Sequence, residues 1–164
     1  MKKTGAGRNG GVDMEEETDL FELIHSAEAV TNEMLIRWTK AFDRNIGVSP
    51  VLVLSELSHR GPQPQSVLAA KLGYTAAAIT NIAGKLVREG LAERRANEQD
   101  RRHVLLAITD KGQEVLKAAH QTGTDLRIRM FSALTREEVE QYIAINRKLL
   151  DTLTAGDEQR EERS

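Results

Sequence analysis

Apolar side chains recur every three or four residues in the first third of the chain, and this spacing predicts one long helix. The recurring positions are Leu20, Ile24, Ala27, Val30, Met34, Trp38 and Phe42. We expect the helix to cover about residues 18–46, because Gly47 is a residue that often follows a helix end. Residues 1–17 include a glycine-rich stretch without this period, and they are expected to form a disordered leader.

Three shorter helices are predicted next, from the residues that begin and end them. Ser49 and Pro50 suit the N-cap and first position of a helix that runs up to a Gly-Pro pair. A short helix then ends at Gly73, and another begins after Thr75 and ends before Gly90. The buried side of this last helix is expected to carry Ile79, Ile82, Leu86 and Val87. Only about three residues separate the last two helices, which is the spacing of a helix-turn-helix.

The next segment is expected to form two short strands joined by a polar tip. The strands are expected at residues 91–95 and 103–109, with a tip at 97–100. Thr109 then caps a helix over about 110–130, and Thr135 opens a capping box for a last helix that ends near 153. Residues 154–164 are expected to form a frayed, charged tail.

A helix-turn-helix followed directly by a hairpin is a winged helix. The sequence therefore predicts a mainly α-helical fold with a small β-hairpin wing. The winged helix-turn-helix is expected at about 48–109, within a domain over 18–153, and long helices at about 18–46 and 110–153 flank it.

Charge is distributed unevenly along the chain, although the net charge is only −2. Residues 1–58 carry six basic and ten acidic side chains, a net charge of −4. Residues 59–103 carry eight and four, a net charge of +4, and residues 104–164 carry nine and eleven, a net charge of −2. A local basic segment on an acidic chain is typical of a phosphate-binding face, although a chance clustering of surface charge gives the same pattern.

A set of short motifs in the central region resembles the MarR family of bacterial transcription regulators. The matching positions are Leu68-Ala69, Leu72-Gly73, Gly90-Leu91, Asp100-Arg101-Arg102, Ile108-Thr109 and Gly112. The motifs cover about 45 residues, and the predicted flanking helices extend the architectural match over most of the chain. The resemblance implies a regulator, in many cases a repressor that responds to an effector, which binds a pseudo-palindromic DNA operator as a homodimer.

The same resemblance implies that the N-terminal and C-terminal helices form the dimer. Many apolar residues in the last two predicted helices fit this role: Leu116, Leu126, Met130, Phe131, Val139, Tyr142, Ile143, Leu149, Leu150 and Leu153. These are more apolar side chains than two helices beside a small lobe would readily bury alone. The alternative is that they pack onto their own lobe as an ordinary core.

Residues expected to contact DNA lie in three places. Phosphate contacts are expected at the start of the first helix of the motif, from Gln65 and Ser66. The recognition helix offers Thr75, Ala76, Ala77, Thr80, Asn81, Lys85 and Arg88. The hairpin offers Arg94, Arg95, Asp100, Arg101 and Arg102, and the resemblance makes Arg102 the wing-tip arginine with Asp100 as its organiser. For each polar residue, a merely solvated side chain is the alternative.

The resemblance places an effector cleft near the first helix, beside His25, Met34, Arg37 and Trp38, although Met34 and Trp38 also suit a dimer core. No cofactor or metal is expected, because the four histidines are scattered and lack helical i, i+3 or i+4 pairing. The chain has no cysteine, which excludes sensing of peroxide by a thiol.

Other classes of protein have less support in the sequence. Catalysis is not expected, because no phosphate loop, nucleophile elbow or metal-ligand motif is present. No apolar run is long enough for a membrane helix or signal peptide, and the cytoplasm is the expected location. A winged helix that binds a protein instead of DNA is the main alternative, but it would not need arginines clustered on its hairpin.

Overall fold

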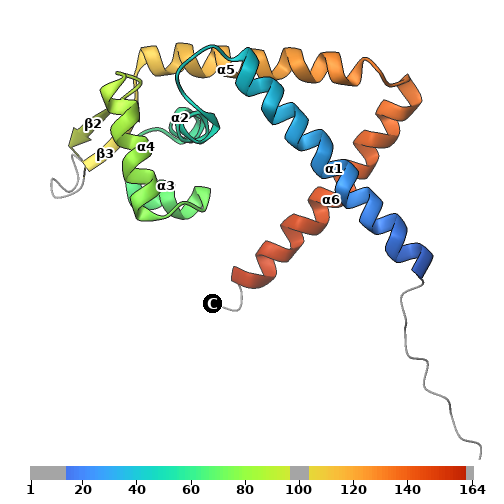
Figure 1. The fold of residues 1–164 in the computed structure, drawn as a ribbon. Helices are drawn as coiled ribbons and strands as arrows, with labels where there is room; N and C mark the ends of the chain where they lie inside the picture. Colours follow the sequence, from blue (N-terminus) through green and yellow to red (C-terminus); the bar gives the residue numbers. More distant parts are fainter. Residues whose placement is uncertain (1–13, 97–103, 162–164) are drawn as a thin grey trace, which may run out of the picture. The chain divides into compact units, whose positions relative to one another are not determined.

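The computed structural model describes residues 14–96 and 104–161 (Figure 1), and its side chains are described for residues 19–96 and 104–155. The chain divides into two compact units, with the boundary between Gly47 and Val48. Within the described residues, no helix combines the length and the hydropathy that crossing a bilayer requires.

The first unit is built on helix α1, Met14–Ala41. It begins four residues before the expected boundary at 18, so residues 14–17 are helical although the sequence placed them in a disordered leader. The glutamates of this stretch are good helix formers, and they suit a helix N-terminus. The helix ends before the predicted 46, and Phe42, which was expected on its apolar face, follows it and is buried.

The second unit opens with three helices and a short strand. Helix α2, Val48–Arg60, leads through strand β1, Gln63–Pro64, to helix α3, Gln65–Leu72, and helix α4, Ala76–Arg88. Gly73 has φ +67° at the end of α3, a left-handed conformation that glycine adopts without strain. The predicted helix-turn-helix is confirmed, with α2 starting one residue before Ser49.

The wing is an antiparallel sheet of strands β2, Ala92–Ala96, and β3, Val104–Ile108. Strand β1 adds to the far side of β3, so the order in the described part of the sheet is β1-β3-β2. Arg94 pairs with Leu106 across β2 and β3, and Gln63 pairs with Leu106 on the other side. The sequence predicted the hairpin but not β1, whose two residues are too short for a periodic pattern.

Two long helices complete the chain. Helix α5 is Asp110–Phe131 and helix α6 is Arg136–Glu161, which extends α6 into the predicted frayed tail. Thr109 caps α5, as predicted, by accepting a hydrogen bond from the Gly112 N–H at 3.0 Å. The capping box of α6 is also confirmed: Glu138 N–H donates to Thr135, and Thr135 N–H donates back to the Glu138 carboxylate at 2.8 Å.

The apolar core of the second unit lies within the winged-helix lobe. Its largest fully buried side chains are Val53, Leu54, Leu57, Leu68, Ile79, Leu86 and Leu106. Helix α5 packs on α2 and contributes its first turns to this core, so Leu116 is buried in its own lobe. The sequence had grouped Leu116 with the dimer side chains, and that prediction is wrong for this residue.

Candidate nucleic-acid interface

The predicted recognition helix α4 presents two different faces. Ile79, Ala83 and Leu86 are buried against the lobe, while Ile82 and Val87 are half-buried, so the buried stripe is shifted slightly from the prediction. The opposite side is exposed and carries five of the predicted contact residues: Ala76, Ala77, Thr80, Asn81 and Arg88. An exposed helix face of small and polar side chains has the shape and the hydrogen-bonding groups to fit a DNA major groove.

The hydroxyl groups of Thr75 and Thr80 already form hydrogen bonds with the backbone of α4. Thr75 is the N-cap, and its oxygen accepts a hydrogen bond from the Ala78 N–H at 3.2 Å. Thr80 donates its hydroxyl to the Ala76 carbonyl at 2.8 Å, which leaves the Thr80 oxygen able to accept from a base amino group. Asn81 is exposed and carries both a donor and an acceptor, so it is the more versatile reader of a base edge.

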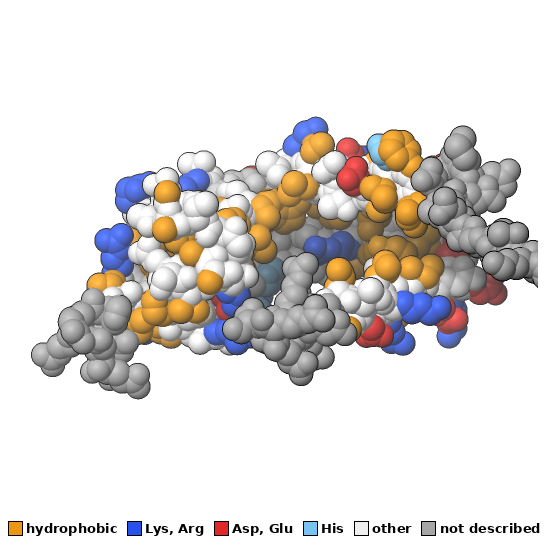
Figure 2. All heavy atoms as spheres, turned by 90° about the horizontal axis from the view of Figure 1, so that it is seen from below, with side chains coloured by type: hydrophobic (Ala, Val, Ile, Leu, Met, Phe, Trp, Pro, Cys, Tyr) orange, Lys and Arg blue, Asp and Glu red, His pale blue; other side chains and the backbone are white. Residues whose placement is uncertain are grey.

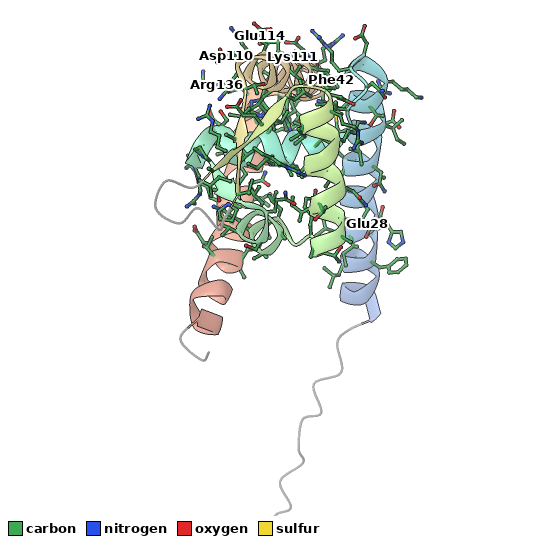
Figure 3. The ribbon with its side chains drawn as sticks, turned by 90° about the vertical axis from the view of Figure 1, so that its left-hand side faces the viewer. Glu28, Phe42, Asp110, Lys111, Glu114 and Arg136 are labelled. Carbon is green, nitrogen blue, oxygen red and sulfur yellow. The ribbon has the colours of Figure 1, made fainter. Side chains whose placement is uncertain are left out.

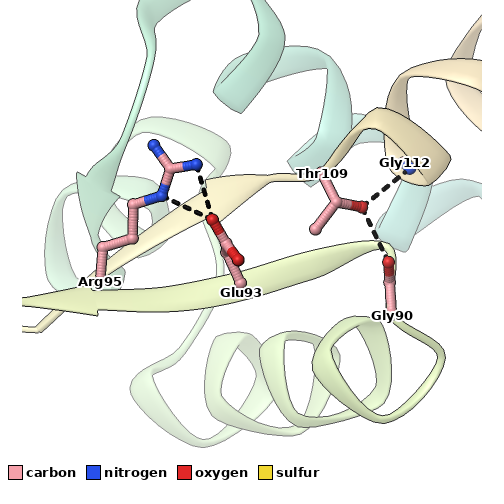
Figure 4. A network of polar contacts seen from close by, with 5 residues as sticks. All are labelled: Gly90, Glu93, Arg95, Thr109 and Gly112. Atoms are coloured by element: carbon pink, nitrogen blue, oxygen red, sulfur yellow. Dashed lines mark hydrogen bonds and ion pairs between the residues drawn. The ribbon is translucent and has the colours of Figure 1, made fainter.

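The basic residues near α4 differ in how far their charge is already balanced. Lys85 is half-buried and lies 3.9 Å from the Glu89 carboxylate one turn away. Arg95 on β2 forms a 2.6 Å ion pair with Glu93, which lies on the same face of the strand (Figure 4). Neither Arg88 nor Arg94 forms an ion pair with another described residue. Among the described residues between Val48 and Ile108, they are therefore the arginine or lysine side chains whose charge no carboxylate balances.

The N-terminus of α3 is a second polar edge of the lobe. Ser66 is exposed and Gln65 is half-buried, as expected for residues that flank the start of the helix. Pro64 occupies the N-cap position, and no side chain among the described residues bonds to the first-turn N–H groups. These open donors at a positive helix end suit a phosphate oxygen.

Glu56 is a structural residue that the sequence did not reveal. It lies on α2 with its side chain only 13% exposed, and its Oε1 is 2.9 Å from Lys71 Nζ on α3 and 3.3 Å from Arg60 Nε. The pKa of its carboxyl is lowered from the ordinary 4.5, mainly by the Lys71 ammonium and also by Gln63 and Arg60, although burial opposes the shift. Glu56 therefore ties α2 to the helix-turn-helix. Its partner Lys71 is fifteen residues away, which no local pattern detects.

The remaining predicted site residues are only partly placed. Asp100, Arg101 and Arg102, together with His103, lie outside the described residues. His25, Met34, Arg37 and Trp38 all lie on α1. Arg37 pairs with Glu33 on the same helix, the His25 ring contacts Phe21, and Trp38 stacks on Phe42 at 4.7 Å. Within the described residues, no three acidic or histidine side chains converge as a metal site.

Comparison with known proteins agrees with this geometry. The model of the MarR family matches residues 49–104, which include the whole helix-turn-helix and β2. The transcriptional repressor MdtR of Bacillus subtilis is 30% identical over 115 residues, which are 69% of this chain and 74% of MdtR. The chain belongs to the MarR family. The transcriptional repressor MprA of Escherichia coli K12 is 34% identical over 103 residues, 63% of this chain and 58% of MprA.

Solved structures of similar proteins confirm the fold. Apo MarR of Escherichia coli is 27% identical, has a TM-score of 0.66, and covers 80% of this chain and 96% of its own. The YusO protein of Bacillus subtilis is 26% identical, with a TM-score of 0.69 over 86% of this chain and 98% of its own. MdtR, MprA and MarR are regulators or resistance proteins by name, and none of these three is named as an enzyme.

Proposed function

We propose that this MarR-family chain is a transcriptional regulator that binds a pseudo-palindromic DNA operator as a homodimer. The observation that carries the proposal is the exposed face of α4. Thr80 and Asn81 lie on this face, while the other side of the helix is buried in the core. The positive end of α3 and the arginines of the wing flank this helix in sequence, and the lobe segment is basic on an acidic chain.

Each group has a distinct role in this proposal. Thr80 and Asn81 read base edges in the major groove, and Ala76 and Ala77 contact thymine methyl groups. Arg88, Arg94 and the α3 N-terminus at Ser66 bind phosphate. Further contacts come from Gln65, Thr75, Lys85, Arg95 and Arg101. Arg102, organised by Asp100, enters the minor groove, where the negative potential is strongest and a weakly hydrated guanidinium fits.

Exposed apolar side chains on the long helices support the homodimer. On α1, Leu20, Phe21 and Leu23 are each more than half exposed, and on α6 Leu149, Leu150 and Leu153 are exposed by 57%, 58% and 68%. Apolar side chains also gather at the surface on the face that Figure 2 shows. Rows of large apolar residues on helices are costly in water and are typically covered by a partner. A second copy of the chain fits this need and also supplies the second lobe that a palindromic operator requires.

Regulation is proposed to work through the separation of the two lobes. An effector bound near His25, Met34, Arg37 and Trp38 would favour a spacing in which both recognition helices no longer fit successive major grooves. Bound operator would block transcription of a neighbouring gene, which makes the protein a repressor that acts in the cytoplasm.

Selection of bound sequences from random DNA tests the proposal directly. We expect an operator with two half-sites whose centres are about 10 bp apart, since both α4 helices must face the same side of the duplex. Asn81→Ala is expected to lose about 1–3 kcal/mol at one base pair per half-site and little elsewhere. Arg94→Ala is expected to weaken all sequences alike and, because each of the two protomers loses one phosphate contact, to flatten log affinity against log salt by about 1.8.

Arg127→Ala, an exposed arginine on α5 beyond the lobe core, serves as the matched control and should leave the salt slope unchanged. A wild-type protein without salt-dependent DNA binding would favour the alternative function, a winged helix that binds another protein. Uniform loss in Asn81→Ala with no change in Arg94→Ala would place the recognition surface elsewhere.

A further inference from the structure

The end of the recognition helix is joined to the start of α5 by a lysine. Lys111, in the first turn of α5, donates from Nζ to the Glu89 carbonyl at 2.7 Å, and Glu89 is the C-cap of α4. The last carbonyl groups of a helix have no partner within the helix, and they carry its negative partial charge. An ammonium group at this position therefore has two effects: it donates a hydrogen bond to an unpaired carbonyl, and its positive charge stabilises the negative end of the helix.

The Lys111 side chain reaches α4 and does not pair with the acidic residues beside it on α5. Asp110 and Glu114 lie beside it on α5, and Figure 3 labels all three residues at the N-terminal part of that helix. Among the described residues, Lys111 forms no ion pair with either carboxylate and bonds to α4 instead. Its amine is also 4.0 Å from the point that a Cβ on Gly90 would occupy, so it lies close over the turn that follows α4.

Three backbone and hydroxyl contacts reinforce the same junction. Thr109 donates its hydroxyl to the Gly90 carbonyl at 2.7 Å (Figure 4), and its N–H donates to the Leu91 carbonyl at 3.1 Å. The same hydroxyl oxygen accepts from the Gly112 N–H, so one side chain caps α5 and binds the segment after α4. Gly112 packs so closely that an added Cβ would overlap the Leu91 carbonyl oxygen.

We propose that Lys111 is a positioning residue for DNA binding, which fixes the direction of α4 relative to α5. This inference rests on the proposed function. Thr80 lies nine residues before Glu89, a distance of about 13 Å along a helix axis, so a tilt of about 5° at the anchored end moves Thr80 by roughly 1 Å. A displacement of that size is enough to weaken hydrogen bonds to base edges.

The test compares three variants of the full chain on its selected operator. Lys111→Met removes the ammonium, Lys111→Arg keeps a cationic donor, and Lys117→Met removes an exposed lysine further along α5 as the matched control. We expect Lys111→Met to lower affinity by about 25-fold, because each of the two protomers loses one net hydrogen bond worth about fivefold. Lys111→Arg and Lys117→Met should stay within about twofold of wild type, and none of the three should change the salt slope.

Hydrogen exchange at the end of α4 provides a second measurement that does not depend on DNA. The amides of Glu89, Gly90 and Leu91 close the last turn, by bonding to Lys85, Val87 and Leu86. They should exchange faster in Lys111→Met than in wild type, Lys111→Arg or Lys117→Met, while circular dichroism shows the same helix content in all four proteins.

Each other outcome overturns the inference in a distinguishable way. A salt slope flattened by about 1.8 in Lys111→Met, one phosphate contact for each of two protomers, would make Lys111 a direct phosphate contact. Wild-type affinity and unchanged exchange in Lys111→Met would show that the lysine positions nothing. Equal loss in Lys117→Met would make the effect one of general charge. Absence of salt-dependent binding by the wild type would overturn the proposed function, and with it the role of Lys111 in DNA binding, even if exchange at α4 responds as expected.

Discussion

The winged-helix lobe and the long terminal helices use apolar residues in opposite ways. In the lobe, Leu54 and Leu86 are fully covered by their own chain. On α1 and α6, comparably large side chains such as Phe21 and Leu153 are 65% and 68% exposed. Both regions are helical and both follow the helical period, so the period alone does not separate them. The lobe is complete within one chain, whereas the helices present surfaces that gain stability only when something covers them.

The largest expected effect comes from substituting one leucine in each region. Leu54→Ala removes a fully buried side chain, and it should lower the free energy of unfolding by about 2–5 kcal/mol without changing the mass of the assembly. Leu150→Asp places a charge among the exposed apolar residues of α6, and it should convert a dimer to a monomer while the lobe stays folded. Sedimentation and thermal unfolding separate the two results.

Leu150→Met is the control for this pair, because it keeps an apolar side chain of similar size. A Leu150→Asp protein that remains dimeric would show that the exposed face of α6 does not form the interface.

Two glycine substitutions compare a position where an added Cβ would overlap backbone atoms with a position where it would meet only a flexible side chain. Gly112→Ala should lower the free energy of unfolding by about 1–3 kcal/mol or more, since its Cβ would overlap the Leu91 carbonyl oxygen and approach Ile108 Cγ1 to 2.8 Å. Gly84→Ala, inside α4, would meet only the flexible end of Arg88 at 3.3 Å, and it should raise stability by up to about 1 kcal/mol. Urea unfolding measures both, and equal effects would contradict the close packing at Gly112.

The smallest expected effect is a pH-dependent one at Glu56. The pKa of this carboxyl is lowered in the folded state, so its ion pairs stabilise the fold above the ordinary pKa of 4.5, and this contribution is lost as the pH falls through the lowered value. Glu56→Gln should therefore be less stable than wild type at pH 7, with the difference shrinking in acid. Thermal melts at pH 7 and pH 3 check this, and a difference that persists at pH 3 would assign the loss to packing instead of charge.

Local signals in the sequence were enough to predict much of the fold. The caps at Thr75, Thr109 and Thr135 were found because a cap and its helix are only a few residues apart. The exposed face of α4 followed from the helical period, which placed Ile79 and Leu86 on the buried side. The order of these elements, a helix-turn-helix followed by a hairpin, then predicted a winged helix, and the MarR-family motifs agreed with it.

Contacts between distant parts of the chain were not predictable in the same way. Lys71 meets Glu56 and Lys111 meets the Glu89 carbonyl across separations of 15 and 22 residues, and nothing in a local pattern pairs these groups. The sequence correctly predicted that Leu116 lies on an apolar face of α5. It did not predict that the lobe of the same chain covers this face, because a helical period identifies a face but not the element that packs on it. The helical end of α6 was missed because its last residues extend the helix without a regular apolar period.

The continuity of α5 has a consequence for how insertions and deletions are tolerated. One helix carries Leu116, which is buried in the lobe, and Ile128, which is 63% exposed beyond it, without a break between them. Removing a single residue from the intervening turns would rotate everything beyond it by about 100° and shorten it by about 1.5 Å. Related chains should therefore vary freely in side chain along this stretch of α5 but hardly at all in its length.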